Sequence, residues 1–251
     1  MLEHGEVLDN REILYSTHGY IFLMSLKYNA DCRAWRKEKT MKEYVKNIIK
    51  HTPIYSLLKK LRNAKIIMEW KRKGCPVPPP HLIKQRALQK YAKMYGLNIM
   101  VETGTYNGDM VNAMRDVFDN IYSIELSNEL YENAEKRFSE QTHIHILHGD
   151  SGSEIEKLVS KIDRPALFWL DAHYSGGVTA RGKEDTPILT ELHHIFNASD
   201  KGHIVVIDDA RVFGVDPAYP TIKELTDFIE SKKDNMDIVV KDDIIRVTPR
   251  Q

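Results

Sequence analysis

The 251-residue sequence predicts an α/β fold with a doubly wound, mostly parallel sheet, and three observations support this prediction. From residue 97 onward, short apolar runs alternate with helical patterns, as in strands joined by crossover helices. A proline-rich stretch, residues 74–80, separates this region from the preceding chain. Near the C-terminus, two strand patterns are separated only by residues 241–243, which is enough for an antiparallel hairpin but not for a parallel crossover. The predicted fold is therefore Rossmann-like, mostly parallel with an antiparallel C-terminal strand pair, plus a helical N-terminal appendage.

We expect three regions along the chain. Residues 1–75 form a helical, partly basic appendage, in which an amphipathic pattern begins at Met41. Residues 76–96 form a proline-rich connector and a leading helix, 81–95, that Gly96 ends. Residues 97–251 form the α/β domain.

Strands and helices alternate within the α/β domain. The expected strands are residues 98–102, 121–125, 143–147, 166–171, 203–208, 237–240 and 244–248. The expected helices are residues 108–118, 128–138, 153–161, 186–196 and 221–231. Ligands of doubly wound sheets bind at the carboxyl ends of the strands. The residues that follow the strands are therefore the candidate site.

Each of the first five strands ends in, or is followed by, an acidic residue. These residues are Glu102, Glu125, Asp150, Asp171 and the pair Asp208 and Asp209. Carboxylates gathered at one edge repel one another unless cations or hydroxyl donors lie among them. Gly104 and Gly108 turn the first strand into a helix, where small residues let a ligand approach the backbone. Glu125 lies about 20 residues further on, where an acid commonly accepts hydrogen bonds from ribose hydroxyls.

These residues resemble a known family. The run Val101, Glu102, Thr103, Gly104, Thr105, Tyr106, Asn107 and Gly108 resembles the first motif of class I S-adenosylmethionine-dependent methyltransferases. Ile124 and Glu125 look like the ribose-binding acid of that family, and Gly149, Asp150 and Ser151 look like its motif at the adenine edge. The resemblance implies that S-adenosylmethionine is the cofactor. The implied cofactor-binding residues are Glu102, Thr103, Gly104, Thr105, Tyr106, Gly108, Glu125, Leu126, Ser127, Gly149, Asp150, Ser151 and Asp171.

Within that family, residues 168–174 and 207–209 are most similar to the macrocin-type sugar O-methyltransferases. This resemblance implies that Asp171, Asp208 and Asp209 hold a divalent cation, and oxygen ligands suit Mg²⁺. A metal-bound hydroxyl has a lowered pKa, and His173 lies close enough in sequence to Asp171 to take its proton. The implied catalytic residues are therefore His173 and Asp171. The implied reaction is methylation of a hydroxyl on a saccharide or a similar small polar acceptor.

Two other function classes remain open from the sequence. An NAD(P)-dependent oxidoreductase or sugar-nucleotide enzyme also uses a glycine turn. However, Gly104 and Gly108 lack the middle glycine of GxGxxG, and a terminal antiparallel hairpin is not expected in that fold. A non-enzymatic nucleic-acid- or membrane-associated module would use the basic stretch before Cys75. That reading leaves Asp171 and the acidic pair after the fifth strand unexplained.

The composition limits the class of protein, its location and its partners. A hydrophobic fraction of 42% and a charged fraction of 29% are typical of a globular protein. Cys32 and Cys75 lack CxxC spacing, so we expect no disulfide framework and a cytoplasmic location. The net charge is zero, yet residues 41–75 carry ten Lys or Arg against Glu43 and Glu69, which leaves +8. This stretch gives no strong nucleic-acid signal, and it leaves open a peripheral membrane contact. A homo-oligomer also remains open.

Overall fold

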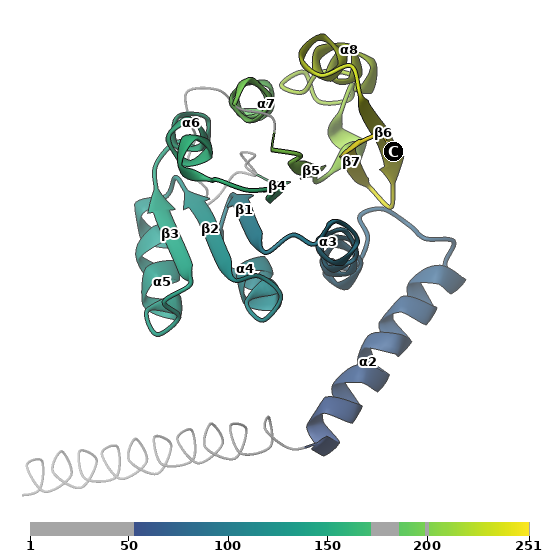
Figure 1. Cartoon of the computed structure of the whole chain (residues 1–251). Helices are drawn as coiled ribbons and strands as arrows, with labels where there is room; N and C mark the ends of the chain where they lie inside the picture. The colour runs from purple at the N-terminus through teal and green to yellow at the C-terminus, as the bar shows by residue number, and fades with distance from the viewer. Residues whose placement is uncertain (1–52, 172–185, 199–200, 251) are drawn as a thin grey trace, which may run out of the picture. The chain divides into compact units, whose positions relative to one another are not determined.

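The computed structural model describes residues 53–171, 186–198 and 201–250 (Figure 1). The chain divides into two units between Ala64 and Lys65, and the second contains the α/β domain. The helix α2 (Pro53–Arg72) crosses this boundary. Its last turns bury Ile67 and Trp70, and Trp70 Nε1 donates a hydrogen bond to the Pro76 carbonyl over 2.9 Å. No helix in these ranges is both long enough and apolar enough to cross a membrane.

A seven-stranded sheet forms the centre of the described domain, in the order β3-β2-β1-β4-β5-β7-β6. The strands are β1 (Ile99–Thr103), β2 (Asn120–Glu125), β3 (Ile144–His148), β4 (Leu167–Leu170), β5 (Ile204–Ile207), β6 (Met236–Lys241) and β7 (Ile244–Pro249). Strands β1 to β5 pair in parallel, whereas β7 is antiparallel to both β5 and β6. This arrangement confirms the predicted fold class. The strand order reverses between β1 and β4, which is where doubly wound sheets open a ligand crevice.

Helices cover both faces of the sheet (Figure 1). The helices are α3 (His81–Tyr95), α4 (Asp109–Met114), α5 (Asn128–Phe138), α6 (Ser151–Lys161), α7 (Ile188–Asn197) and α8 (Ile222–Lys232), with a short 3-10 helix η1 (Ala210–Val212). Residues of α3, α4 and α5 pack in one hydrophobic core, and residues of α6, α7 and α8 pack in the other. Gly96 ends α3 in the left-handed conformation, as predicted. Helix α4 is shorter than expected, because the chain turns after Met114.

Alternate residues of each strand belong to the two cores. Ile99 and Val101 of β1 lie in the α6–α8 core, while Met100 lies in the α3–α5 core. The same alternation places Glu102 on the α3 side of the sheet and Thr103 on the α7 side. At the end of β5 it places Asp208 on the α3 side. The residues at the carboxyl ends of the strands therefore lie at the same edge of the sheet but on its two opposite faces.

Candidate functional site

The loop between β1 and α4 is held against the end of β2. Gly104 and Gly108 have φ values of 83° and 71°, in the left-handed region that favours glycine. The Gly104 amide donates to the Ile124 carbonyl over 2.9 Å. A Cβ on Gly108 would lie 2.6 Å from Cε2 of Phe138, so the close approach of the loop to α5 requires glycine there.

Glu125 is a buried carboxylate that joins the loop to β2. Its Oε2 accepts a hydrogen bond from the Tyr106 amide over 2.8 Å, and its Oε1 accepts one from the Ser127 amide over 2.9 Å. Ser127 in turn caps α5 by accepting from the Leu130 amide. The structure therefore brings together three predicted site residues, Glu125, Tyr106 and Ser127. Each carboxylate oxygen can accept a second hydrogen bond, so Glu125 can bind a hydroxyl group while it holds the loop.

Glu102 is also buried, on the α3 side of β1. Ser123 Oγ donates a hydrogen bond to its Oε2, and Ser123 also lies 2.6 Å from the Thr105 hydroxyl. Burial raises the pKa of Glu102 to about 8, although the Ser123 hydroxyl opposes the rise. Glu102 therefore holds a proton at neutral pH and positions Ser123 and Thr105 under the loop.

The residues after β3 have a structural role at the start of α6. Asp150 is the N-cap of this helix, and its Oδ1 accepts from the Ser153 amide over 3.2 Å. The Gly149 amide donates to the Glu125 carbonyl over 3.0 Å, which ties this turn to the end of β2. Ser151 is buried and hydrogen-bonds to the side chain of Glu191.

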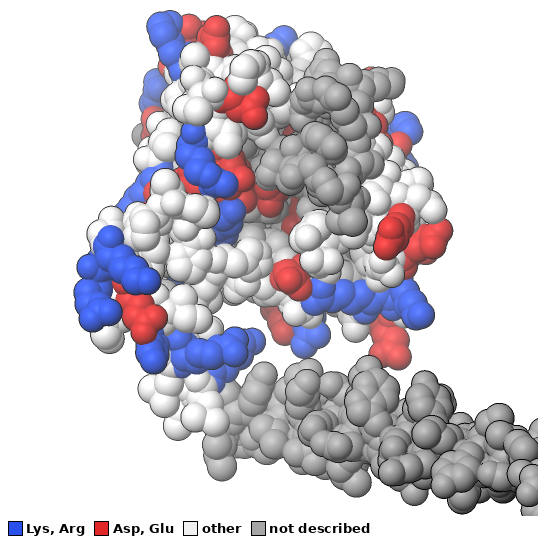
Figure 2. Space-filling model, turned by 180° about the vertical axis from the view of Figure 1, so that it is seen from behind, with Lys and Arg blue, Asp and Glu red and all other residues white. Residues whose placement is uncertain are grey.

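The acidic pair after β5 is joined to two basic side chains. Lys84 of α3 forms an ion pair with Asp208 Oδ2, and its Nζ lies 3.3 Å from Asp209 Oδ1. Arg211 Nη1 and Nη2 lie 2.8 Å and 3.0 Å from the two carboxylate oxygens of Asp209. Arg211 also forms an ion pair with Asp243. Figure 2 shows Asp and Glu side chains near the centre of one face, with Lys or Arg side chains beside them.

Solved structures share this architecture, although no protein-family model and no curated protein matches the sequence. The O-methyltransferase TomG from Streptomyces achromogenes, solved with S-adenosylmethionine, has a TM-score of 0.52 and 15% identity over 75% of this chain and 89% of that chain. An O-methyltransferase from Bacillus cereus, in complex with S-adenosylhomocysteine, has a TM-score of 0.51 and 11% identity over 75% and 90%. The methyltransferase PaMTH1 from Podospora anserina, also bound to S-adenosylhomocysteine, has a TM-score of 0.50 and 12% identity over 80% and 97%.

The chain has the fold of class I methyltransferases. The predicted resemblance is thus confirmed for the fold, including the antiparallel end of the sheet. In a class I methyltransferase fold, the loop after β1 and the end of β2 lie at the crevice where the strand order reverses. Glu125 and the glycine loop occupy that position here.

The predicted magnesium site is not formed by the described residues. Among them, no group of three or more His, Cys, Asp or Glu side chains is arranged to hold a metal ion. The prediction assumed that Asp171, Asp208 and Asp209 needed an added cation. Lys84 and Arg211 lie against three of the four oxygens of the acidic pair, whereas Asp208 Oδ1 is buried without a hydrogen-bond partner among the described residues. The described residues therefore give no support to Mg²⁺ binding at this edge, and the predicted ligand set stays a prediction.

Four further residues lie at this edge of the sheet that the sequence did not predict. Lys84 and Arg211 form ion pairs with the acidic pair, and Glu191 lies buried on the other face of the sheet. His81 begins α3, and the electrostatic effect of Asp171 reaches its imidazole. Lys84 and Glu191 could have been noticed, because each is a charged residue on the apolar stripe of its helix, one turn from Leu88 and Ile195 respectively.

Of the two predicted catalytic residues, His173 and Asp171, His173 lies outside the described residues. Its role as a base therefore stays a prediction. Asp171 is described, and its amide donates to the Thr103 carbonyl over 3.2 Å at the point where β1 and β4 end. This contact places Asp171 next to the end of β1, where the glycine loop begins.

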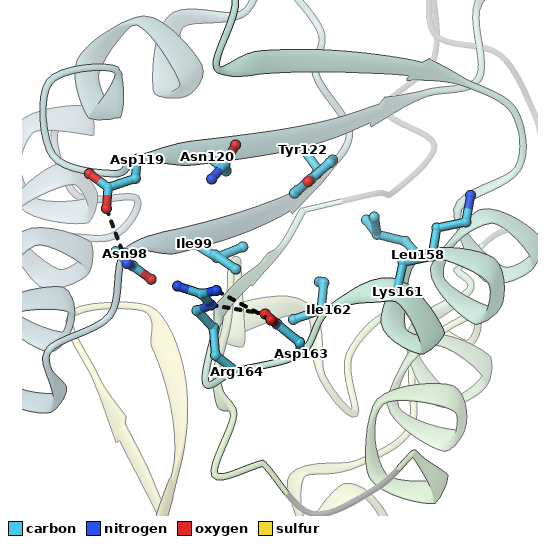
Figure 3. A pocket seen from close by; sticks show the side chains of 10 residues that line it. All are labelled: Asn98, Ile99, Asp119, Asn120, Tyr122, Leu158, Lys161, Ile162, Asp163 and Arg164. Atoms are coloured by element: carbon cyan, nitrogen blue, oxygen red, sulfur yellow. Dashed lines mark hydrogen bonds and ion pairs between the residues drawn. The ribbon is translucent and has the colours of Figure 1, made fainter.

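A separate pocket of about 230 Å³ lies at the opposite edge of the sheet (Figure 3). It is lined by residues near the amino ends of β1 and β2 and the carboxyl end of α6. Polar side chains there pair with one another, because Arg164 Nε binds Asp163 over 2.9 Å and Asn98 binds Asp119 over 3.1 Å. Doubly wound sheets bind their ligands at the carboxyl ends of the strands, so this pocket is distinct from the candidate site.

Proposed function

We propose that this protein is an S-adenosylmethionine-dependent O-methyltransferase that acts on a hydroxyl of a saccharide or a similar small polar acceptor. The observation that carries the proposal is the position of Glu125. Its buried carboxylate binds the glycine loop at the point where the strand order reverses, and it retains the capacity to accept hydroxyl donors. The shared fold supports the reaction class, and the likeness of residues 168–174 and 207–209 to sugar O-methyltransferases supports the acceptor class.

The residues around the loop fit the cofactor. Glu125 would bind the ribose hydroxyls, and the backbone between Gly104 and Gly108 would approach the ligand closely because glycine leaves room. The bound cofactor supplies a methyl group on a sulfonium centre. The protein must orient the acceptor hydroxyl and remove its proton, and we assign proton removal to His173.

Calorimetric titration of the full chain with S-adenosylmethionine tests the cofactor. We expect saturable binding, and we expect Glu125→Ala to weaken it by about 10- to 100-fold, the loss for a hydrogen bond to a charged group. Glu129→Ala is the matched control, because Glu129 is exposed on the first turn of α5. Thermal melting of both variants separates a lost ligand contact from a loosened loop, since Glu125 also binds the Tyr106 amide.

The same titration with NADH tests the rival class of enzyme. A nicotinamide oxidoreductase would also place an acid near the end of β2. Binding of NADH without binding of S-adenosylmethionine would overturn the proposal.

We also propose a peripheral contact between the basic stretch, residues 41–75, and an anionic membrane surface. In the described part of this stretch, Leu57, Leu58, Leu61 and Met68 of α2 are each more than half exposed. Lys59, Lys60, Arg62 and Lys65 are interspersed with them on the same helix. The basic side chains would attract anionic headgroups, and the exposed apolar side chains of the same helix would add apolar contact area.

A further inference from the structure

We infer that Lys84 is the resident cation of the acidic pair after β5, so that this site holds Asp208 and Asp209 without a divalent metal. Helix α3, which precedes the sheet in sequence, thereby contributes a charged side chain to the site at the carboxyl end of β5. The inference about the cation stands on the contacts alone. Its consequence for catalysis, that methyl transfer needs no metal, rests on the proposed function.

The burial of this ion pair is the first argument. The Lys84 side chain is 14% exposed, and the Asp208 side chain is 3% exposed. Lys84 lies one turn before Leu88, which is fully buried against the sheet, so the packing of α3 directs the ammonium toward the end of β5. A carboxylate this deeply buried is stable only beside a cation or a hydrogen-bond donor, and Lys84 supplies both.

The position of the two cations is the second argument. Lys84 and Arg211 bring two positive charges to the carboxylates of Asp208, Asp209 and Asp243, at an edge where Asp171 also lies. A divalent ion bound by the same carboxylates would have to displace the Lys84 ammonium. It would also lie beside that like charge in a poorly solvated environment. Lys84 therefore occupies the position from which a cation would contact both carboxylates.

Lys84 acts here as a positioning residue. Its ammonium contacts both carboxylates, so it fixes the relative orientation of Asp208 and Asp209 at the edge where Asp171 also lies. This arrangement makes the geometry of the edge independent of the concentration of metal ions.

Metal binding by the full-length protein is the direct test. We expect calorimetric titration of the wild-type protein with Mn²⁺ to show no saturable binding, and we expect EDTA to leave its Tm unchanged. Neither measurement uses S-adenosylmethionine or turnover, so failure here is distinguishable from failure of the proposed function. Saturable uptake of Mn²⁺ that Asp208→Asn abolishes would overturn the inference.

Substitution of the cation is the second test. Lys84→Met keeps the length of the side chain and removes its charge, and we expect it to lower Tm by about 5 °C or more. Lys93→Met, at an exposed position of the same helix, should change Tm by about 2 °C or less. The double variant Lys84→Met/Asp208→Asn removes both charges and should regain part of the loss. Equal melting of Lys84→Met and Lys93→Met would contradict the inference, as would a double variant less stable than Lys84→Met.

Discussion

Glu191 shows how one buried residue gives the protein a pH dependence. It lies on the inner face of α7 and is 1% exposed, and its Oε1 has no hydrogen-bond partner in the part of the chain that the structure describes. Burial raises the pKa of Glu191 to about 7 from an ordinary value of 4.5, although hydrogen bonds from Ser151 and Thr103 oppose the rise. The folded protein therefore binds a proton that the unfolded chain releases near pH 4.5.

This proton sets the sign of the effect on stability. The contribution of Glu191 is fully present below pH 4.5 and is lost as the pH rises through about 7, because ionisation in the buried site is unfavourable. Glu191→Gln cannot ionise. Between pH 5 and pH 8, we expect the free energy of unfolding of the variant to rise by about 2 kcal/mol relative to that of the wild-type protein. This corresponds to a relative rise of roughly 5 °C in Tm. Glu156→Gln, at an exposed position of α6, is the control and should follow the wild-type protein. A constant difference in Tm between Glu191→Gln and wild type would refute this assignment.

The choice of base is a second prediction at the scale of residues. His173 is the proposed base, and His81 is an alternative imidazole at the same edge. Burial and the Lys84 ammonium lower the pKa of His81, so His81 is neutral at physiological pH and could accept a proton. We expect His173→Gln to lower kcat by about 10²- to 10⁴-fold with little change in cofactor affinity, and His81→Gln to have a smaller effect. The reverse order of the two variants would transfer the role of base to His81.

In the turn from β1 into α4, the lack of room for a side chain restricts position 108 to glycine. Gly96 and Gly108 have similar φ values of 63° and 71°, but a Cβ on Gly96 would meet no atom within 4 Å. Gly96→Ala should therefore cost about 1 kcal/mol, from backbone strain alone. Gly108→Ala should cost about 2 to 4 kcal/mol, because its Cβ also meets the ring of buried Phe138.

Urea unfolding of the two alanine variants measures this difference. Phe138→Leu should be less costly in the Gly108→Ala background than in the wild-type protein, since the smaller side chain relieves the contact. Equal losses for Gly96→Ala and Gly108→Ala would show that α5 moves away from the loop.

The type and order of the elements could be predicted from the sequence because they depend on local periodicity. The apolar runs at β1 and β5 and the short connection before β7 determine a parallel sheet with an antiparallel end. The acids at the strand ends could also be located. Their partners could not, because the contact between Lys84 and Asp208 joins residues 124 positions apart. The place of Lys84 on the apolar stripe of α3 indicates burial, but it does not indicate which carboxylate the ammonium meets. For this reason the sequence did not indicate the Lys84 ammonium that lies against two of the three predicted metal ligands.

The distribution of charge over the whole molecule leads to a prediction about membranes. Residues 41–75 carry +8 within a chain of zero net charge. We expect the full chain to sediment with vesicles that contain phosphatidylserine, and to be released by salt because the attraction is electrostatic. Lys59→Glu/Lys60→Glu should weaken this binding, whereas Lys232→Glu/Lys233→Glu, at the end of α8, should not. Equal binding to neutral vesicles would contradict the electrostatic basis.

Strand β7 lies inside the sheet, between β5 and β6, although it follows β6 in sequence. During synthesis β5 and β6 therefore leave the ribosome before the strand that separates them. Until β7 emerges, β5 presents an open edge that other chains could pair with. Deletion of residues 244–249 would leave that edge exposed permanently and would make the product a substrate for chaperones and proteases.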